Sequence, residues 1–469
     1  MNTQLLLQFL SLCFVTSVVG AQSASNDTST TTSDEAQPNV GWVAGPKQRG
    51  TLILVYGCLS TIFASTWTVL HLNVPGPEDT PWLKALRKAK WMAITVLFPE
   101  FIFSKAVCEL RLAVADLYAM HVAMSKAQLK WTDTHLSSRR TSMSHSIQNA
   151  RSGAIEWSQK REWTLLHSYY ANMGGLLYTT RALCNRQDIP PCTASSLASA
   201  LEHRSGVELL KEFNLRKEDI EDKSKADWLL KAIAMSQISW LILNVWARHV
   251  AQFPITQLEI ASVAFSLIAI ATYAANWWKP KDITSSTALT TTVEPGLWYQ
   301  KPPRIFISFI DRLLAPAASE YVPDYSRIRR ISNDRVWMEG QPPLILFLTA
   351  VSSLMFGGFH CLAWNFEFPS KSELVLWRVA SIASTTLPSV SLGISLVSHY
   401  LSTAFADRRH VVSVINSLAP LNHFPPAWWG LLERRPSLAI LVLLFTSLRS
   451  TPKGVYDDTP WTRFLPNIS

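Results

Sequence analysis

The stretch that decides the fold is TLILVYGCLSTIFASTWTVLHL, which runs from Thr51 to Leu72. It contains no Asp, Glu, Lys or Arg, and Asn73 and Pro75 bring it to an end. A helix needs about 20 mostly apolar residues to cross roughly 30 Å of hydrocarbon. The stretch therefore predicts a transmembrane helix.

The composition of the whole chain agrees with this prediction. Of its 469 residues, 48% are hydrophobic, 16% are charged and nineteen are Trp, and the mean hydropathy is +0.12. Such a chain is too apolar for an ordinary soluble protein. The net charge of +9 fits Lys and Arg beside an anionic leaflet, and no RNP-like run or zinc-finger spacing points to a nucleic-acid partner. We predict an all-α fold, a polytopic integral membrane helix bundle with about six to eight transmembrane helices.

The N-terminal region has the pattern of a secreted or membrane protein. Residues 1–21 predict a signal peptide, with an apolar run from Leu5 to Val19 followed by small residues. No basic residue precedes this run, so an uncleaved anchor is the alternative. Residues 22–50 are rich in Ser and Thr and predict a disordered lumenal segment. Asn26, in the sequon Asn-Asp-Thr, is the predicted glycosylation site.

Residues 51–124 should hold the first two transmembrane helices, the second of them continuous from Trp91 to about Met124. A long polar and amphipathic loop follows over residues 125–225. Within it, EWTLLHSYYANMGGLLY (162–178) predicts either a membrane-surface or re-entrant piece or a small helical core. Residues 226–280 predict a transmembrane hairpin with helices over about 228–246 and 255–278.

The second half begins with a basic linker over residues 281–342, followed by two transmembrane helices within 343–402, over about 343–364 and 374–401. The C-terminal region, 403–469, has a short apolar run at 438–448 that is too short to span unless it is tilted or half-inserted. Arginines place the linker in the cytoplasm, which conflicts with simple alternation from a lumenal N-terminus. We therefore expect that either the stretch 162–178 spans or one segment is re-entrant.

The six cysteines do not indicate a metal site. Cys58, Cys108 and Cys361 lie in apolar segments, where Cys usually acts as a small hydrophobic residue. Cys184 and Cys192 could form a disulfide if their loop is lumenal.

The second predicted helix carries most of the candidate acids. Lys105, Glu109 and Asp116 lie on one helical stripe, or Lys105 simply pairs with Glu109. Glu100 follows Pro99 among phenylalanines that include Phe103. Desolvation disfavours a charged carboxyl there, so Glu100 could deliver a proton near neutral pH. Alternatively, it caps backbone groups that Pro99 leaves free.

A second candidate site lies in GGFHCLAWNFEFPS, residues 357–370. His360, Trp364 and Glu367 are spaced i, i+4 and i+7, which predicts one shared helix face near an interface. The alternative is a Trp of the interfacial belt and a His that hydrogen-bonds between helices. Trp67 and His71 repeat the same spacing.

Five blocks carry a family resemblance: RGTLILVYGCLSTIFASTWTVLHLNVP, KWMAITVLFPEFIFSKA, EWTLLHSYYANMGG, GGFHCLAWNFEFPS with the following E and LWR, and GVYDDTPWTRFLPNIS. By these blocks the chain resembles a large family of fungal multi-pass membrane proteins. It also resembles, more loosely, the membrane-bound terpene cyclases of fungal meroterpenoid pathways, such as those making ascofuranone or macrophorins. That resemblance implies protonation and cyclisation of a prenyl tail or its epoxide.

The residues allow such chemistry, because aromatic faces stabilise developing positive charge and no motif of a soluble enzyme or DDxxD run is present. We therefore predict an isomerase- or lyase-type terpene cyclase of secondary metabolism in the endoplasmic reticulum or another endomembrane, without cofactor or metal. Its partners would be a lipid-like prenylated substrate and membrane lipids. The alternatives are a non-catalytic scaffold or sensor and a proton-coupled transporter. Candidate catalytic residues are Glu100, Glu109, Asp116, His360 and Glu367, and candidate lining residues are Trp67, His71, Phe103 and Trp364.

Overall fold

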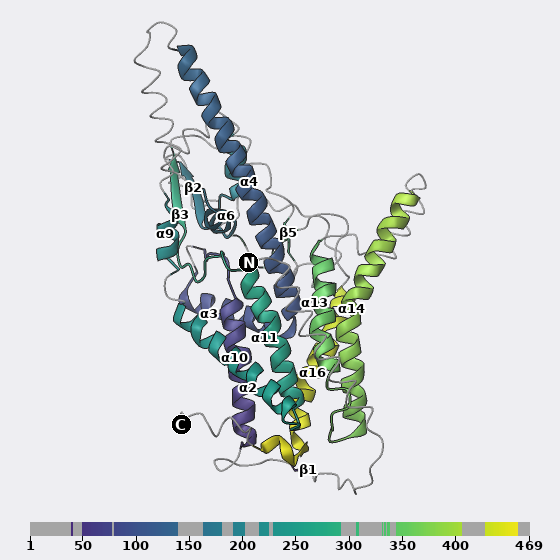
Figure 1. Ribbon diagram of the computed structural model, residues 1–469. Helices are drawn as coiled ribbons and strands as arrows, with labels where there is room; N and C mark the ends of the chain where they lie inside the picture. Colours follow the sequence, from purple (N-terminus) through teal and green to yellow (C-terminus); the bar gives the residue numbers. More distant parts are fainter. Residues whose placement is uncertain are drawn as a thin grey trace.

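The computed structural model describes residues 39–40, 49–76, 79–138, 163–180, 191–201, 215–224, 228–291, 306–308, 331, 333, 335–337, 344–405 and 427–457. These residues are mostly helical, as the composition predicts (Figure 1). The predicted signal peptide, the sequon at Asn26 and Cys184 lie outside the described residues.

Long helices form the body of the protein. Their bounds are α2 Thr51–Val69, α3 Pro81–Leu97, α4 Pro99–Ser138, α10 Trp228–Val250, α11 Gln257–Ala275, α13 Leu344–Cys361, α14 Lys371–Ala404 and α16 Ala427–Thr446. The shorter helices are α6 Leu165–Asn172, α7 Ala194–Leu201 and α9 Lys217–Asp222, and two 3-10 turns follow α16, η5 Ser447–Arg449 and η6 Lys453–Tyr456.

Short strands pair in three two-stranded sheets that the sequence did not predict. β1 Asn39–Val40 is antiparallel to β6 Thr451–Pro452, β2 Leu176–Thr180 is parallel to β3 Thr287–Thr291, and β4 Phe306–Ser308 is antiparallel to β5 Arg335–Trp337. The β1–β6 pair places residues far apart in the sequence side by side, at the lower end of the view in Figure 1.

Three of the described helices, α2, α11 and α13, are long and apolar enough to cross a membrane. The pair formed by α3 and the first part of α4 would be a fourth candidate, although it is bent by 110°. Large apolar side chains also point outward along much of the bundle, which is typical of a lipid-facing surface. Examples are Leu52, Ile53, Tyr56 and Phe63 on α2, Trp240, Leu243 and Trp246 on α10, Val375, Val379, Val390, Val397 and Tyr400 on α14, and Leu438 and Val442 on α16.

The prediction of one continuous helix from Trp91 to Met124 is wrong, because the helix is interrupted at Phe98, between α3 and α4. Phe98 leaves the helical region, with φ −141° and ψ 61°. Pro99 explains this, since its ring disfavours helical backbone in the preceding residue and it has no N–H to donate. From this break α4 runs outward past α6, β2 and β3 (Figure 1).

The aromatic stretch 162–178 contributes to a small hydrophobic core. It forms α6, a tight turn and the first part of β2, and its Tyr170 is fully buried with Met120 and Leu197. The turn needs glycine, because Gly174 has φ +83° and a Cβ on Gly175 would lie 2.5 Å from the Tyr170 ring. The small helical core, one of the two predicted alternatives, is therefore present.

At the end of the bundle away from this small core, Arg248, near the end of α10, connects several segments of the chain by hydrogen bonds. Its guanidinium is buried and donates hydrogen bonds to the backbone carbonyls of Pro254, Gly454, Val455 and Asp457, at 2.8 to 3.3 Å. Glu259, at the start of α11, forms an ion pair with Arg49. The turn between α10 and α11 thus holds the C-terminal segment and the start of the bundle together.

Candidate functional site

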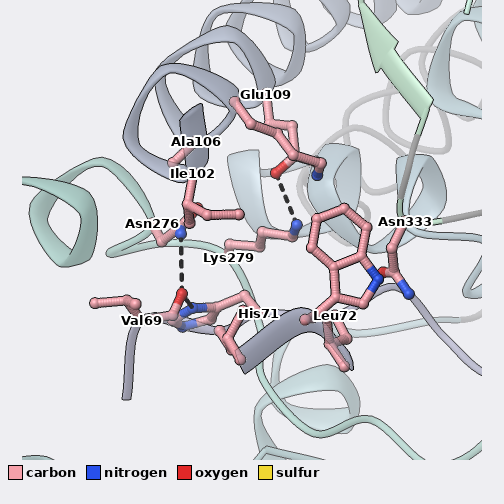
Figure 2. A pocket seen from close by; sticks show the side chains of 12 residues that line it. Val69, His71, Leu72, Ile102, Ala106, Glu109, Asn276, Lys279 and Asn333 are labelled. Atoms are coloured by element: carbon pink, nitrogen blue, oxygen red, sulfur yellow. Dashed lines mark hydrogen bonds and ion pairs between the residues drawn. The ribbon is translucent and has the colours of Figure 1, made fainter. Parts of the chain in front are cut away.

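A pocket lies where α2 ends, between α3, α4 and the chain that follows α11 (Figure 2). Its lining combines apolar residues of α2, α3 and α4 with charged and amide side chains. The lining residues are Val69, Leu70, His71, Leu72, Trp91, Ile102, Lys105, Ala106, Glu109, Asn276, Lys279 and Asn333. Sequence reasoning had selected only two of them as site residues, Glu109 and His71.

The pocket is small. Its cavity volume is about 30 Å³, and one water needs roughly 10–15 Å³ of such space. The cavity therefore has room for two or three waters, or for a small polar head group, and not for a whole prenylated molecule.

Two lysines share one carboxylate in this pocket. Lys105, one helical turn before Glu109 on α4, forms an ion pair with one of its oxygens. The Lys279 Nζ atom lies 2.8 Å from the other oxygen, Oε2. The Lys105–Glu109 pair proposed as the alternative to an acidic stripe is thus present, with a second cation that the sequence did not reveal.

Burial makes this arrangement costly. The Lys279 side chain is 2% exposed and that of Glu109 is 20% exposed. Burial lowers the pKa of Lys279 from its usual value to about 8, although the negative charge of Glu109 acts in the opposite direction and Lys105 adds to the lowering. Among the described residues that line the pocket, two lysines beside one carboxylate give one excess positive charge.

The end of α2 supplies the other polar wall. Its last carbonyl, on Val69, accepts a hydrogen bond from Nδ1 of His71 at 3.0 Å and one from the Asn276 amide at 3.4 Å (Figure 2). These bonds satisfy an acceptor that a helix end leaves without an intrahelical partner. Asn276 is 4% exposed, and its Oδ1 atom has no hydrogen-bond partner among the described residues.

Glu100 and Asp116 lie on either side of this pocket along α4 and do not line it. Glu100 is buried, 8% exposed, beside the break, and its backbone carbonyl accepts a hydrogen bond from Ser352 of α13 at 3.4 Å. Asp116 accepts one from the Asn172 amide at 2.8 Å, and Asn172 accepts one from the backbone of Ala194. Asp116 thus helps hold the start of α7 in the small core.

The predicted common face of His360, Trp364 and Glu367 does not form. The helix α13 ends at Cys361, so the spacing i, i+4, i+7 has no helix to carry it. His360 is 1% exposed, donates from Nδ1 to the Phe356 carbonyl at 2.8 Å and packs against Trp377. Glu367 is exposed in the following loop. These three residues were predicted as a site because a helix was assumed to continue past its real end.

The remaining predicted lining residues, Trp67, Phe103 and Trp364, are half-buried and lie outside the pocket. Trp67 packs under the ammonium of Lys88, 3.6 Å from its ring centroid. Trp364 faces Arg378, whose guanidinium lies 4.9 Å from the ring. Both rings stabilise cationic side chains of neighbouring helices.

Sequence reasoning missed Lys279, Asn276 and Asn333. The run Trp277-Trp278-Lys279-Pro280 was interpreted as the end of a helix, and nothing local marks its lysine as a partner of Glu109. Among the described residues, no group of three or more His, Cys, Asp or Glu side chains is placed to hold a metal ion. Cys192 is a buried free thiol, and burial raises its pKa to about 12.

A family match covers residues 26–301, more than half of the chain. The chain belongs to DUF8562, a family of unknown function. The matched part of this DUF8562 protein includes every lining residue of the pocket except Asn333. No curated protein and no solved structure matches the chain.

Proposed function

We propose that this DUF8562 protein is a polytopic integral membrane enzyme that acts on a lipid-like substrate dissolved in the membrane. The observation that carries the proposal is the order of polar groups along α4. Glu100 lies at the buried start of the helix and Glu109 nine residues further out, in the pocket, which at 1.5 Å per residue is a separation of about 13 Å. Nine residues also turn an α-helix by about two and a half revolutions, so the two carboxyl groups lie on opposite faces of α4, and the tail of an amphiphile whose head lies at Glu109 would pass around the helix to reach Glu100.

In the membrane placement that we propose, α2, α10, α11, α13, α14 and α16 cross the bilayer, and α3 with the start of α4 enters it and returns to the same side. Two observations support this. Leu54 packs with Ala363 at one end of the bundle, whereas Leu70 packs with Ile345 at the other, so α2 and α13 run in opposite directions. The β1–β6 pair brings both ends of the described chain to one side.

This placement removes the conflict found in the sequence. With α3 and α4 re-entrant, the basic linker and the segment 125–225 fall on one side, which would be cytoplasmic by the positive-inside rule. Asn26 would then be lumenal, and the free thiol of Cys192 would lie in a reducing compartment. We propose the endoplasmic reticulum or another endomembrane as its location.

The reaction that we propose is acid-initiated cyclisation of a prenyl tail or its terminal epoxide. Glu100 would give its proton to the epoxide oxygen or terminal alkene, and the π electrons of the chain would form the new carbon–carbon bond. The final proton would return to the Glu100 carboxylate, which regenerates the acid, whereas Glu109 is ion-paired with two lysines and lies at the head-group end. In this scheme Asp116, His360 and Glu367 have no catalytic role.

A test is product analysis of microsomes that contain the protein, fed with a prenylated phenol that bears a carboxyl group and with its terminal epoxide. We expect cyclised product from wild type and none from Glu100→Gln, whereas Glu367→Gln, at an exposed site, should keep full turnover. Equal turnover by Glu100→Gln and wild type would refute Glu100 as the donor. No product from correctly folded wild type would favour a non-catalytic lipid-binding protein, for which the small cavity is the supporting observation.

A further inference from the structure

Among the described residues that line it, the pocket has one more positive than negative charge, which favours an anionic ligand. Lys105 and Lys279 bring two positive charges to one negative charge on Glu109, and all three side chains are at most 20% exposed. Keeping an uncompensated charge away from water is expensive. A ligand with one negative charge would make the cluster neutral.

Hydrogen-bonding capacity points in the same direction. An ammonium group has three N–H donors, and within the described part of the chain Lys105 and Lys279 each give one, both to Glu109. Donors therefore remain on both lysines for further acceptor oxygens. The Oδ1 atom of Asn276, without a partner among the described residues, offers one acceptor to a hydroxyl group or water that accompanies the ligand.

The size and the walls of the pocket further limit which ligands fit. About 30 Å³ is room for the three heavy atoms of a carboxylate. Leu70, Trp91 and Ile102 form an apolar wall that belongs to one buried hydrophobic cluster. Such a wall suits the first methylene or aromatic carbons behind an acidic head.

We propose that the cluster of Lys105, Glu109 and Lys279 is a binding site for the carboxylate head of an amphiphile, whose apolar tail leaves along the wall of Leu70, Trp91 and Ile102. This deepens the proposed function by naming the head group of its substrate, and it rests on the membrane placement proposed above. The head-group proposal does not depend on the cyclisation step, because binding measurements alone test it.

The experiment uses the purified full-length protein in nanodiscs made of neutral phosphatidylcholine. The probes are oleate, oleyl alcohol and butyrate, whose binding is measured by titration calorimetry. We expect oleate to bind at least tenfold more tightly than oleyl alcohol, which has the same tail without the charge. Butyrate distinguishes a carboxylate on a membrane amphiphile from one on a water-soluble acid. Because butyrate lacks the long tail, it should bind much more weakly than oleate.

Variants test whether the preference for oleate over oleyl alcohol arises in the pocket. Lys279→Met should weaken oleate binding at least tenfold and leave oleyl alcohol unchanged, and Lys279→Arg should keep most of the oleate affinity. Arg449→Met is the matched control, because Arg449 is 62% exposed and pairs with Glu373 outside the pocket.

Equal wild-type affinities for oleate and oleyl alcohol would overturn the proposal whether or not any variant folds, and so would unchanged oleate binding by Lys279→Met. If butyrate binds as tightly as oleate, the proposal that the ligand is an amphiphile is refuted, and the pocket is a site for a soluble acid. Charge-dependent binding without cyclised product would contradict the reaction proposed above and leave the head-group site intact.

Discussion

Removing the carboxylate of Glu109 should destabilise the protein far more than removing either lysine. In Glu109→Gln, two buried ammonium groups lie close together and no acidic side chain remains among the described residues that line the pocket, whereas Lys279→Met leaves the neutral Lys105–Glu109 pair. Breaking a buried pair by removing one partner costs about 3–5 kcal/mol. Because Glu109 is 20% exposed, we expect the lower end, about 3 kcal/mol.

Lys279→Met should cost much less, about 1 kcal/mol or below, because it also removes a desolvated ammonium whose side chain is 2% exposed. The triple variant, with both lysines changed to Met and Glu109 to Gln, should return close to wild type, since no uncompensated charge remains. The order of stability, rather than any single value, is the prediction.

The assay is thermal unfolding in detergent, followed by the size-exclusion profile of a fluorescent fusion, for wild type and all three variants. For a chain of 469 residues, a loss of about 3 kcal/mol corresponds to a fall of about 3 °C in the unfolding temperature. An unfolding temperature for Glu109→Gln within 1 °C of wild type would refute the reasoning. So would a triple variant that is less stable than Glu109→Gln.

Three other predictions follow from contacts elsewhere and one from the pocket. Gly357→Ala should cost about 1–3 kcal/mol, because its Cβ would lie 2.7 Å from the backbone of α14, whereas Gly358→Ala, with nothing within 4 Å, should be neutral by thermal unfolding. Arg248→Met should free the C-terminal turn and raise its rate of cleavage by carboxypeptidase at least tenfold. Burial lowers the pKa of His167 below its usual 6.5, so the unfolded chain takes up a proton first and stability should fall as pH drops below about 6.5, with a smaller fall in His167→Gln. Oleate binding should weaken as pH rises above 8, because the pKa of Lys279 is about 8 and its charge is lost there.

The helices could be predicted from local sequence because the signals for them are local. The predicted helix over Thr51 to Leu72 corresponds to α2, Thr51–Val69, and the hairpin over 226–280 contains α10 and α11. A run of apolar residues without charges costs little to place in a helix and much to expose to water. At Pro99 the local signal was noted, but a continuous helix was still predicted, and that prediction was wrong.

The site could be predicted only in part. Glu109 was selected because ionisable groups in apolar helices are unusual, and His71 because it repeats the spacing between Trp and His seen at the second candidate site; both line the pocket. The shared face of His360, Trp364 and Glu367 was predicted on the assumption of a continuing helix, but that helix ends at Cys361. Periodicity indicates which residues share a face only for as long as the helix lasts, and helix ends depend on the turn and on packing.

The sequence by itself determined that this chain forms apolar helices, and it marked the charges along them that need partners. Only the tertiary structure decided which partners those charges have. Lys279 is 170 residues from Glu109 along the chain, yet their side chains meet at 2.8 Å. Hydrophobicity and helix propensity act over a few neighbouring residues, whereas the pairing of buried charges depends on how distant helices pack, since only packing brings the two charges together and removes the water between them.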